Sequence, residues 1–291
     1  MPLPRIGVVI VTMGTRPREL AALLASVARQ DVPATRVVLV GNATPLTDVP
    51  DDASGLPLTK LPLTGNLGCP GGRNVGLTLL RDTDACDVVV ELDDDGLLIA
   101  DEVFRTVQQR YARDPALGII GFRVADEHGH TERRWVPRLR VGDPLRGGPV
   151  TAFLGGGHAL SLPMLRQIGL WPAEFFFGHE ESDLAWRALD AGWSIHYAPD
   201  LVLQHPRTSP ARHAVYHHHT ARNRVWLARR RLPAVLIPAH LGDVFTVPHG
   251  AHGARHALSP HRAKARVRPV RELPPGAPRA RTGHRGHRTG L

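Results

Sequence analysis

Continuous apolar runs alternate with segments of helical periodicity along the first 200 residues of this 291-residue chain. Runs rich in Val, Ile and Leu predict buried strands at residues 6–12, 36–40, 87–92 and 118–124, with a weaker strand at 57–63. Apolar positions at helical spacing predict a helix that opens at Pro17 and includes Leu20, Leu23, Leu24 and Val27, a helix at 102–113, and a third helix that ends near residue 81. This alternation is typical of right-handed βαβ units and a mainly parallel sheet.

The segment after residue 125 has a less regular pattern, in which glycine, proline and charged residues interrupt the apolar positions. The predicted elements are a hairpin or long loop at 126–143, a strand broken by glycines at 150–162, a helix at 179–193, short strands at 194–199 and 201–206, and a basic, partly amphipathic helix at 212–233. Gly192 ends the first of these helices and Pro233 stops the second.

The composition changes near residue 240, after which Arg, His, Pro, Gly and Ala dominate. We therefore expect a catalytic domain at 1–240 and a basic low-complexity tail at 241–291, disordered from about 249, because such a segment buries too little apolar surface to offset its ordering entropy. The same bias is what a shifted reading frame in a GC-rich gene would encode, and that hypothesis stays open beside a native tail.

The net charge of +9 is concentrated in this tail. Residues 249–291 hold ten of the 36 Lys and Arg and one of the 27 acids, which leaves 26 of each for the rest of the chain. A specific nucleic-acid partner is therefore not expected of the body. Two cysteines outside any CxxC pair, a short N-terminal apolar run and the lack of a run of about 20 apolar residues predict a cytoplasmic protein without zinc or a membrane span.

Three consecutive aspartates, Asp93, Asp94 and Asp95, follow the predicted strand "VVVELD" directly. The carboxyl ends of parallel strands are where open α/β sheets bind their ligands. Carboxylate oxygens suit Mg²⁺ or Mn²⁺, and these ions usually bind phosphates with only one or two protein carboxylates. The triplet therefore indicates a metal-diphosphate site, while a solvated acidic turn remains the alternative.

A second group of acids, Glu180, Glu181 and Asp183, opens the helix predicted at 179–193. Acids in a first turn complement the helix dipole, which accounts for one or two of them. A further carboxylate next to the aromatic run "FFF" would have a raised pKa, as suits a general base. The segment is not a zinc-protease helix, because Asp183 stands where the second histidine would be needed.

Several motifs occur in a fixed order: "VVIVTMGTRP", "GNLGCPGGRNVGL", "ELDDDG", "FLGGGHALSLPMLRQIGLWPAEFFFGHEESDLAWRALDAGW" and "YAPDLVLQHP". Together they resemble the family 2 glycosyltransferases, particularly bacterial members of actinobacterial type, over residues 5 to about 233. The resemblance implies the GT-A fold, an α/β fold with a mixed, mostly parallel sheet flanked by helices. It also implies a nucleoside-diphosphate-sugar donor and a divalent cation.

The resemblance carries over onto individual residues. It implies that Asp93, Asp95 and His205 bind Mn²⁺ or Mg²⁺, and that Glu181, beside Glu180, is the catalytic base. The implied donor-binding residues are Thr12, Arg16, Asn42, Asn66, Gly68, Arg73, Asn74, Asp93, Asp94, Gly155, Gly156 and Gly157. The segment Val40-Gly41-Asn42 departs from the family's usual "VDN", because Gly41 replaces the Asp that reads the nucleobase, and Glu181 replaces the usual Asp of the paired-acid motif.

The implied activity is inverting transfer of a sugar to a hydroxyl of a glycan, a lipid-linked or a small-molecule acceptor. The alternatives are a nucleotidyltransferase acting on a sugar phosphate, and a protein that binds anionic surfaces or nucleic acid through its basic tail. The basic segment around Trp226 would suit peripheral contact with anionic lipid at the inner face of a membrane. His217–His219 and Arg133–Trp135 are read either as ligand-binding groups or as ordinary exposed residues.

Overall fold

The computed structural model describes residues 2–51, 53–138, 142–207 and 216–246. The strands are β1 Ile6–Thr12, β2 Arg36–Gly41, β3 Leu58–Pro62, β4 Val88–Asp93, β5 Leu97–Leu98, β6 Leu117–Ala125, β7 Gly148–Pro149, β8 Gly157–Ser161 and β9 Ser194–Gln204. The helices are α1 Pro17–Ala28, α2 Gly68–Asp82, α3 Val103–Arg113, α4 Leu162–Ile168, α5 Glu180–Asp190, α6 Tyr216–Arg231 and α7 Ile237–Thr246, with 3₁₀ turns η1 Ala53–Gly55, η2 Arg133–Trp135, η3 Ala173–Phe175 and η5 Ala234–Leu236.

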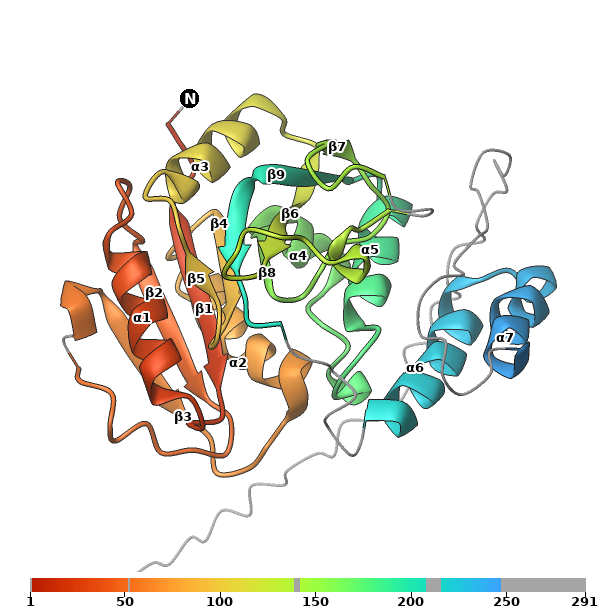
Figure 1. The fold of residues 1–291 in the computed structure, drawn as a ribbon, viewed down its shortest axis with the longest axis horizontal. Helices are drawn as coiled ribbons and strands as arrows, with labels where there is room; N and C mark the ends of the chain where they lie inside the picture. The colour runs from red at the N-terminus through yellow and green to blue at the C-terminus, as the bar shows by residue number, and fades with distance from the viewer. Residues whose placement is uncertain (1, 52, 139–141, 208–215, 247–291) are drawn as a thin grey trace, which may run out of the picture. The chain divides into compact units, whose positions relative to one another are not determined.

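The strands of the described residues form one mixed sheet in the order β3-β2-β1-β4-β8-β6-β9-β5, with β7 also paired to β9 (Figure 1). Neighbours from β3 to β4 are parallel, and β6 is parallel to β9. The strand β8 runs antiparallel to both β4 and β6, so it joins two parallel halves that point the same way. The sheet is therefore mixed but mostly parallel, as expected from the sequence.

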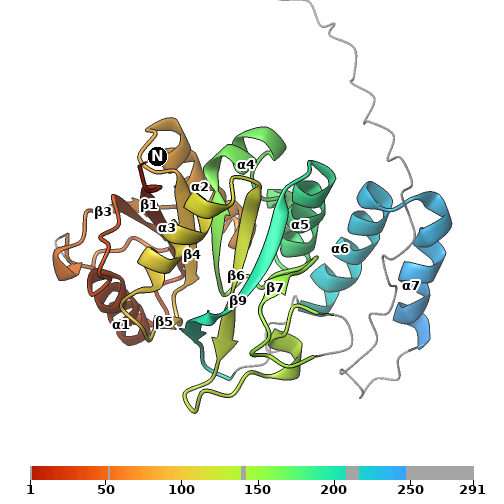
Figure 2. The same ribbon diagram turned by 90° about the horizontal axis from the view of Figure 1, so that it is seen from above.

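Alternate residues of the strands face two separate apolar cores. On β1, Ile6, Val8 and Ile10 lie in the core beneath α1 and α3, whereas Val9 lies in the core beneath α2, α4 and α5. Figure 2 shows these two groups of helices on opposite faces of the sheet. Side chains of a strand alternate between faces, so a strand covered on both sides is apolar throughout. This explains the continuous runs from which the strands were predicted.

The glycines of "GGRNVGL" let α2 approach β1 closely. A side-chain carbon at Gly72 would lie 2.8 Å from Val11 Cγ1, and one at Gly76 would lie 2.7 Å from Val9 Cγ1. Any larger residue at these two positions would push the helix away from the sheet. The spacing of four residues places both glycines on the same face of the helix.

Two predicted elements differ from the structure in the second half of the sheet. The segment expected to form two short strands at 194–199 and 201–206 is one strand, β9, whose pairing with β6 jumps from Ala198 to Val202. The intervening residues form a bulge that contains Pro199, which has no N–H to donate. The strand expected across 150–162 begins only at Gly157. Helix α4 and the two-residue strands β5 and β7 were not predicted from the sequence.

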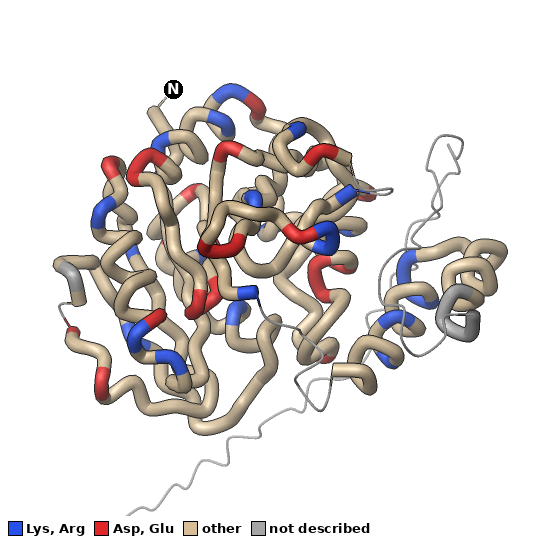
Figure 3. The backbone as a smooth tube through the Cα atoms, viewed as in Figure 1, with Lys and Arg blue, Asp and Glu red and all other residues tan. Residues whose placement is uncertain are grey.

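Helix α7 crosses the expected boundary at residue 240 and runs to Thr246. The rest of the expected tail, 247–291, lies outside the described residues. Figure 3 shows α6 as a basic element without acidic residues. Two of its arginines nevertheless pair with acids: Arg230 with Glu174 at 2.5 Å and Arg231 with Asp183 at 2.7 Å. Lipid contact through α6 stays a prediction.

Within the described residues, the longest and most apolar helical stretches fall short of what is needed to cross a membrane.

Candidate active site

The aspartate triplet lies where β4 leaves the sheet between β1 and β8. The last residue of β4 is Asp93, and its carbonyl accepts a hydrogen bond from Gly96 N at 2.9 Å, which closes a tight turn around Asp94 and Asp95. Along β4, Val90 and Leu92 face α1 and α3. The alternation therefore directs Glu91 and Asp93 toward the face covered by α2, α4 and α5. Asp93 therefore points to this face from the end of the strand, whereas Asp94 and Asp95 belong to the turn.

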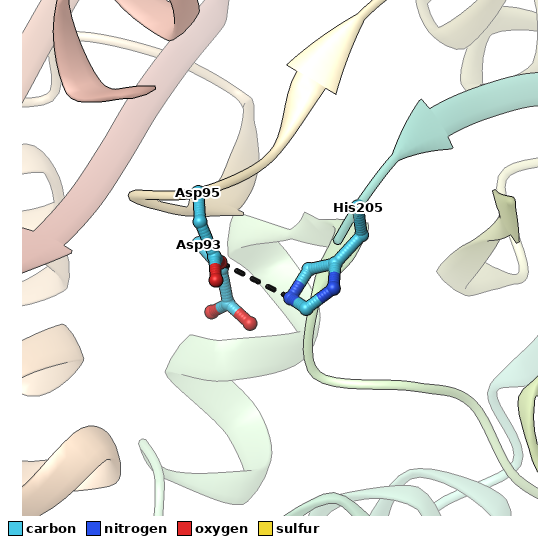
Figure 4. Close-up of side chains that lie close together, drawn as sticks. All are labelled: Asp93, Asp95 and His205. Carbon is cyan, nitrogen blue, oxygen red and sulfur yellow. Dashed lines mark ion pairs between the residues drawn. The ribbon is translucent and has the colours of Figure 1, made fainter. Parts of the chain in front are cut away.

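Asp93, Asp95 and His205 come together beyond the strand ends. One ligand atom from each lies within 4.8 Å of the others, and His205 Nε2 lies 3.1 Å from Asp95 Oδ1. Figure 4 shows both carboxylates and the imidazole facing one another from β4 and from the end of β9. The backbone N–H of His205 donates to Ala125 O at 2.8 Å, and Nδ1 of its imidazole lies 2.8 Å from Pro206 O. These contacts hold the residue in place and leave Nε2 facing the two carboxylates.

The electrostatics of this group favour charged forms. Burial opposes ionisation of Asp95, but the hydrogen bond and charge of His205 and the charge of Arg16 hold its pKa below the usual range. Burial likewise opposes protonation of His205, while Asp95 raises its pKa. Two carboxylates and one imidazole nitrogen are a donor set that fits Mn²⁺ or Mg²⁺. No other group of three such residues is this close in the part of the chain that the structure describes.

Asp94 points away from this cluster toward the end of β1. Thr12 Oγ1 donates to Asp94 Oδ2 at 2.7 Å, and Arg16 Nη1 donates to Asp94 Oδ1 at 2.9 Å and contacts Asp95 Oδ2 at 2.8 Å. Burial is the larger effect and raises the pKa of Asp94. The predicted donor-binding residues Thr12, Arg16 and Asp94 therefore form one mutual network, in which Arg16 offsets the repulsion between two adjacent carboxylates.

Arg73 offsets the third carboxylate from the opposite side. It is only 2% exposed, and its Nη2 donates to Asp93 Oδ1 at 2.9 Å and to Gly155 O at 2.5 Å. Its guanidinium lies over the Trp171 ring at 5.3 Å, and its Nη1 is buried without a hydrogen-bond partner. Arg73 is thus buried behind Asp93, where α2 packs closely on β1. Its contact with the donor, which the resemblance implies, stays a prediction.

Asn74 and Asn42, both expected to contact the donor, have their amides occupied by the protein. Asn74 exchanges two 2.9 Å hydrogen bonds with the backbone of Trp171. Asn42 is 3% exposed, donates to Asn66 Oδ1 at 2.9 Å and accepts from Leu67 N at 2.8 Å. These two asparagines therefore hold the segment that leads into α2 and the approach of α2 to Trp171.

The Gly155–Gly157 segment passes between the glutamates of α5 and the group formed by Asp93, Asp95 and His205, called the cation cluster below. A side-chain carbon at Gly155 would overlap Glu181 Oε1, and one at Gly156 would lie 3.6 Å from Asp93 Oδ2. A side-chain carbon at Gly157 would lie 2.9 Å from Leu203 Cδ2. These glycines thus leave room for Glu181 on one side of the segment and for Asp93 on the other.

Glu180 and Glu181 begin α5 in very different surroundings. Glu180 is 2% exposed and its Oε2 has no hydrogen-bond partner, whereas Glu181 is partly exposed. Burial and then the charge of Glu181 raise the pKa of Glu180 to about 8, and burial also raises the pKa of Glu181 although the charge of Arg73 opposes it. Asp183, the third acid, pairs with Arg187 and Arg231 at 2.8 and 2.7 Å and belongs to the packing of α5 on α6.

No protein-family model and no curated protein matches the sequence significantly. Solved structures match over most of the described fold. A mannosyltransferase, PcManGT, from Pyrobaculum calidifontis in complex with GDP-Man and Mn²⁺ has a TM-score of 0.58 at 19% identity, covering 84% of this chain and 70% of that one. TarS from S. aureus has a TM-score of 0.60 at 18% identity, covering 83% of this chain and 43% of that one.

A third match, GalNAc-T7 with UDP, GalNAc and Mn²⁺, has a TM-score of 0.59 at 14% identity and covers 78% of this chain and 48% of that one. The fold is GT-A. The matched region covers less than half the length of TarS and of GalNAc-T7.

The GT-A sheet contains a buried, hydrogen-bonded pair of side chains that was not predicted from the sequence. Glu91 and His158 lie opposite each other on β4 and β8, both completely buried, with Glu91 Oε2 2.8 Å from His158 Nε2. Trp171 Nε1 donates to the same oxygen at 3.0 Å. The only signal in the sequence was an acid within a buried run, and its partner is 67 residues away. This group supports Arg73 through Trp171.

Part of the segment predicted as a hairpin or long loop at 126–143 lies beside His205. Trp135 in η2 is 9% exposed and its ring meets that of His205 edge-on at 6.2 Å. Glu132, in the same loop, pairs with both Arg134 and Arg207 at 2.5 Å. Trp135 therefore borders His205, and the role of Arg133–Trp135 in binding a ligand stays a prediction.

Proposed function

We propose that the protein is a family 2 glycosyltransferase of the bacterial, actinobacterial type that transfers a sugar, with inversion, from a nucleoside-diphosphate sugar to an acceptor hydroxyl in the presence of Mn²⁺ or Mg²⁺. The observation that carries the proposal is the approach of Asp93, Asp95 and His205 to within 4.8 Å, from segments about 110 residues apart. The Mn²⁺ and nucleotide sugars bound to the structural neighbours support the same assignment.

The chemistry needs a charged leaving group and a base on opposite sides of one carbon. A divalent cation bound by Asp93, Asp95 and His205 would neutralise charge on the departing diphosphate. Glu181 would take the proton of the acceptor hydroxyl. The oxygen of that hydroxyl would bond to the anomeric carbon while the bond from this carbon to the diphosphate oxygen breaks. Attack from the face opposite the leaving group inverts the anomeric centre in one step, so one base is sufficient.

Exposure supports Glu181 rather than Glu180 as the base. An acceptor hydroxyl must come within about 3 Å of the base, and Glu180 is too deeply buried for such an approach. The closeness of Glu181 to Gly155, whose neighbour Gly156 borders Asp93, links the base to the cation cluster across a single peptide unit. A raised pKa suits a base that must accept a proton near neutral pH.

A panel of nucleoside-diphosphate sugars tests the proposal. Thermal unfolding is measured for the full chain with each donor, with and without Mn²⁺, and a hit is followed by detecting nucleoside diphosphate released in the presence of alcohol acceptors. A ligand at 100 times its dissociation constant stabilises the folded state by about 2.7 kcal/mol. We expect Mn²⁺-dependent stabilisation by one class of donor. Stabilisation that does not depend on the cation, or by no donor, would contradict the proposal.

A further inference from the structure

The backbone immediately before Glu180 and Glu181 adopts an unusual conformation. Phe176 and His179 have φ values of 65° and 68°, and Gly178 between them has φ 85°. The left-handed region is uncommon for residues other than glycine and costly for a bulky aromatic one. Such a conformation persists only where surrounding contacts hold it in place. The position of the two glutamates therefore depends on whatever holds residues 175–179.

One side chain, Asn223 of α6, contacts three carbonyls of this segment. Its Nδ2 lies 2.9 Å from Phe175 O, 3.0 Å from Phe177 O and 2.8 Å from Gly178 O, and the residue is completely buried. The amide has two protons, so at least one is shared between two acceptors. Without the Asn223 amide, each of these carbonyls would lose a hydrogen-bond donor in a site largely closed to solvent, and an unsatisfied acceptor there destabilises the fold.

The neighbouring arginine fixes the orientation of this amide. Arg222 Nε donates to Asn223 Oδ1 at 3.0 Å, while its Nη2 donates to Phe175 O at 2.8 Å. The guanidinium also lies 4.4 Å from the centre of the Trp226 ring. With Oδ1 accepting from Arg222, the NH₂ group is the one that faces the carbonyls. The arrangement is therefore specific for an amide and excludes a carboxylate.

The other side of the segment is held by the start of α2. Cys69 N donates to Phe176 O at 2.9 Å, and Gly68, at φ 74°, leaves no room for a side chain against the same carbonyl. The segment thus lies between α2, which carries Arg73 near the cation cluster, and α6, which carries Asn223. Of these two supports, α6 is the one that uses a side chain.

We propose that Asn223 is a positioning residue for the general base: it holds residues 175–178 so that Glu181 faces the anomeric carbon beside the cation cluster. The inference rests on the proposed function, since it presupposes that Glu181 removes a proton. It assigns a role to α6, which lies outside the sheet that carries the cation ligands. A displacement of about 1 Å of a catalytic group costs on the order of 100-fold in rate.

Three variants test the proposal at one position. Asn223→Ala removes the donor, Asn223→Asp places a carboxylate against three carbonyls, and Asn223→Ser restores a single donor. We expect kcat to fall on the order of 100-fold for the first two and less for Asn223→Ser, with the KM for the donor and the affinity for Mn²⁺ within about twofold of the original protein. Hydrogen exchange of the amides of 175–181 should become at least tenfold faster in Asn223→Ala.

The matched control is Gln108→Glu. Gln108 on α3 is also a buried amide, 8% exposed, that donates to a backbone carbonyl, Pro4 O at 2.8 Å, on the opposite face of the sheet. We expect this variant to lower the melting temperature without changing kcat or exchange at 175–181. If Asn223→Asp does not fold, Asn223→Ala and Asn223→Ser carry the comparison.

The outcomes separate the inference from the proposed function. If the original protein transfers sugar and the folded Asn223 variants keep their kcat, or lose kcat and Mn²⁺ affinity in equal proportion, Asn223 is not a positioning residue. If exchange at 175–181 is unchanged in Asn223→Ala, the amide does not hold the segment. If the original protein transfers no sugar while exchange still accelerates, the proposed function fails and the structural role of Asn223 stands.

Discussion

Replacing Glu180 by Gln should stabilise the folded protein at neutral and alkaline pH. The carboxyl is 2% exposed, one of its oxygens has no hydrogen-bond partner, and its pKa is raised from 4.5 to about 8. A group whose pKa is higher in the folded state binds more protons there than in the unfolded chain. Its contribution to stability is therefore greatest below pH 4.5 and is lost as the pH rises toward about 8.

The size of the effect follows from the shift. At pH 7 the folded protein must keep a proton that the unfolded chain releases, which costs about 3 kcal/mol at roughly 1.4 kcal/mol for each pKa unit between 4.5 and 7. An amide avoids this cost but leaves its own buried N–H groups short of partners, at about 1 to 2 kcal/mol. The net gain expected for Glu180→Gln is about 1 to 2 kcal/mol, or roughly 2 to 8 °C in melting temperature.

The assay compares urea unfolding of the original protein and of Glu180→Gln at pH 5 and at pH 8. We expect the two to be similar at pH 5 and the variant to be more stable at pH 8. Glu127→Gln, on an exposed turn, is the matched control and should change stability by less than about 0.5 kcal/mol at both pH values. A Glu180→Gln variant that is equally or less stable at pH 8 would show that burial does not raise the pKa of this carboxyl.

Two further predictions concern the base and the glycine segment. Glu181→Gln should lower kcat by about 10² to 10⁴ and keep its affinity for the nucleotide. In the original protein, kcat should fall on the acidic side at a pH above 4.5, because burial raises the pKa of Glu181. Near-normal turnover in Glu181→Gln, or a fall of kcat at the usual pKa of glutamate, would exclude Glu181 as the base. Gly155→Ala should lower kcat while the protein stays folded, because the added methyl group would overlap Glu181 Oε1. The control variant Gly65→Ala should keep its kcat, because its methyl group would meet no atom within 4 Å. Equal activities of the two variants would contradict this geometry.

The parallel half of the sheet was predictable because its strands are buried on both faces. Residues such as Val9 and Ile10 serve different cores yet are both apolar, so the run is continuous in sequence. The antiparallel insertion of β8 between β4 and β6 was not predictable, since pairing between strands distant in sequence leaves no local signal. For the same reason the bulge at Pro199 was mistaken for a break between two strands.

The resemblance to family 2 glycosyltransferases implied that Asp93, Asp95 and His205 meet, and in the structure Asp95 Oδ1 lies 3.1 Å from His205 Nε2. The partners of individual polar residues could not. Asn42 and Asn74 matched donor-binding positions in type, but their hydrogen bonds go to Asn66, Leu67 and Trp171. A sequence shows which residues are polar but not which partner each has in the fold, and this determines whether an amide is available to a ligand.

In the proposed reaction, Asp93, Asp95 and His205 hold a divalent cation that binds the diphosphate of the donor. The most direct test is titration of Mn²⁺, followed by electron paramagnetic resonance, with and without a nucleoside diphosphate, on the original protein and on Asp95→Asn. Glu127→Gln serves as the control. We expect one Mn²⁺ per chain, tighter binding with the nucleotide, and at least a tenfold loss of affinity in Asp95→Asn while its melting temperature shows that it is folded. Equal Mn²⁺ affinity in Asp95→Asn and the original protein would contradict the claim.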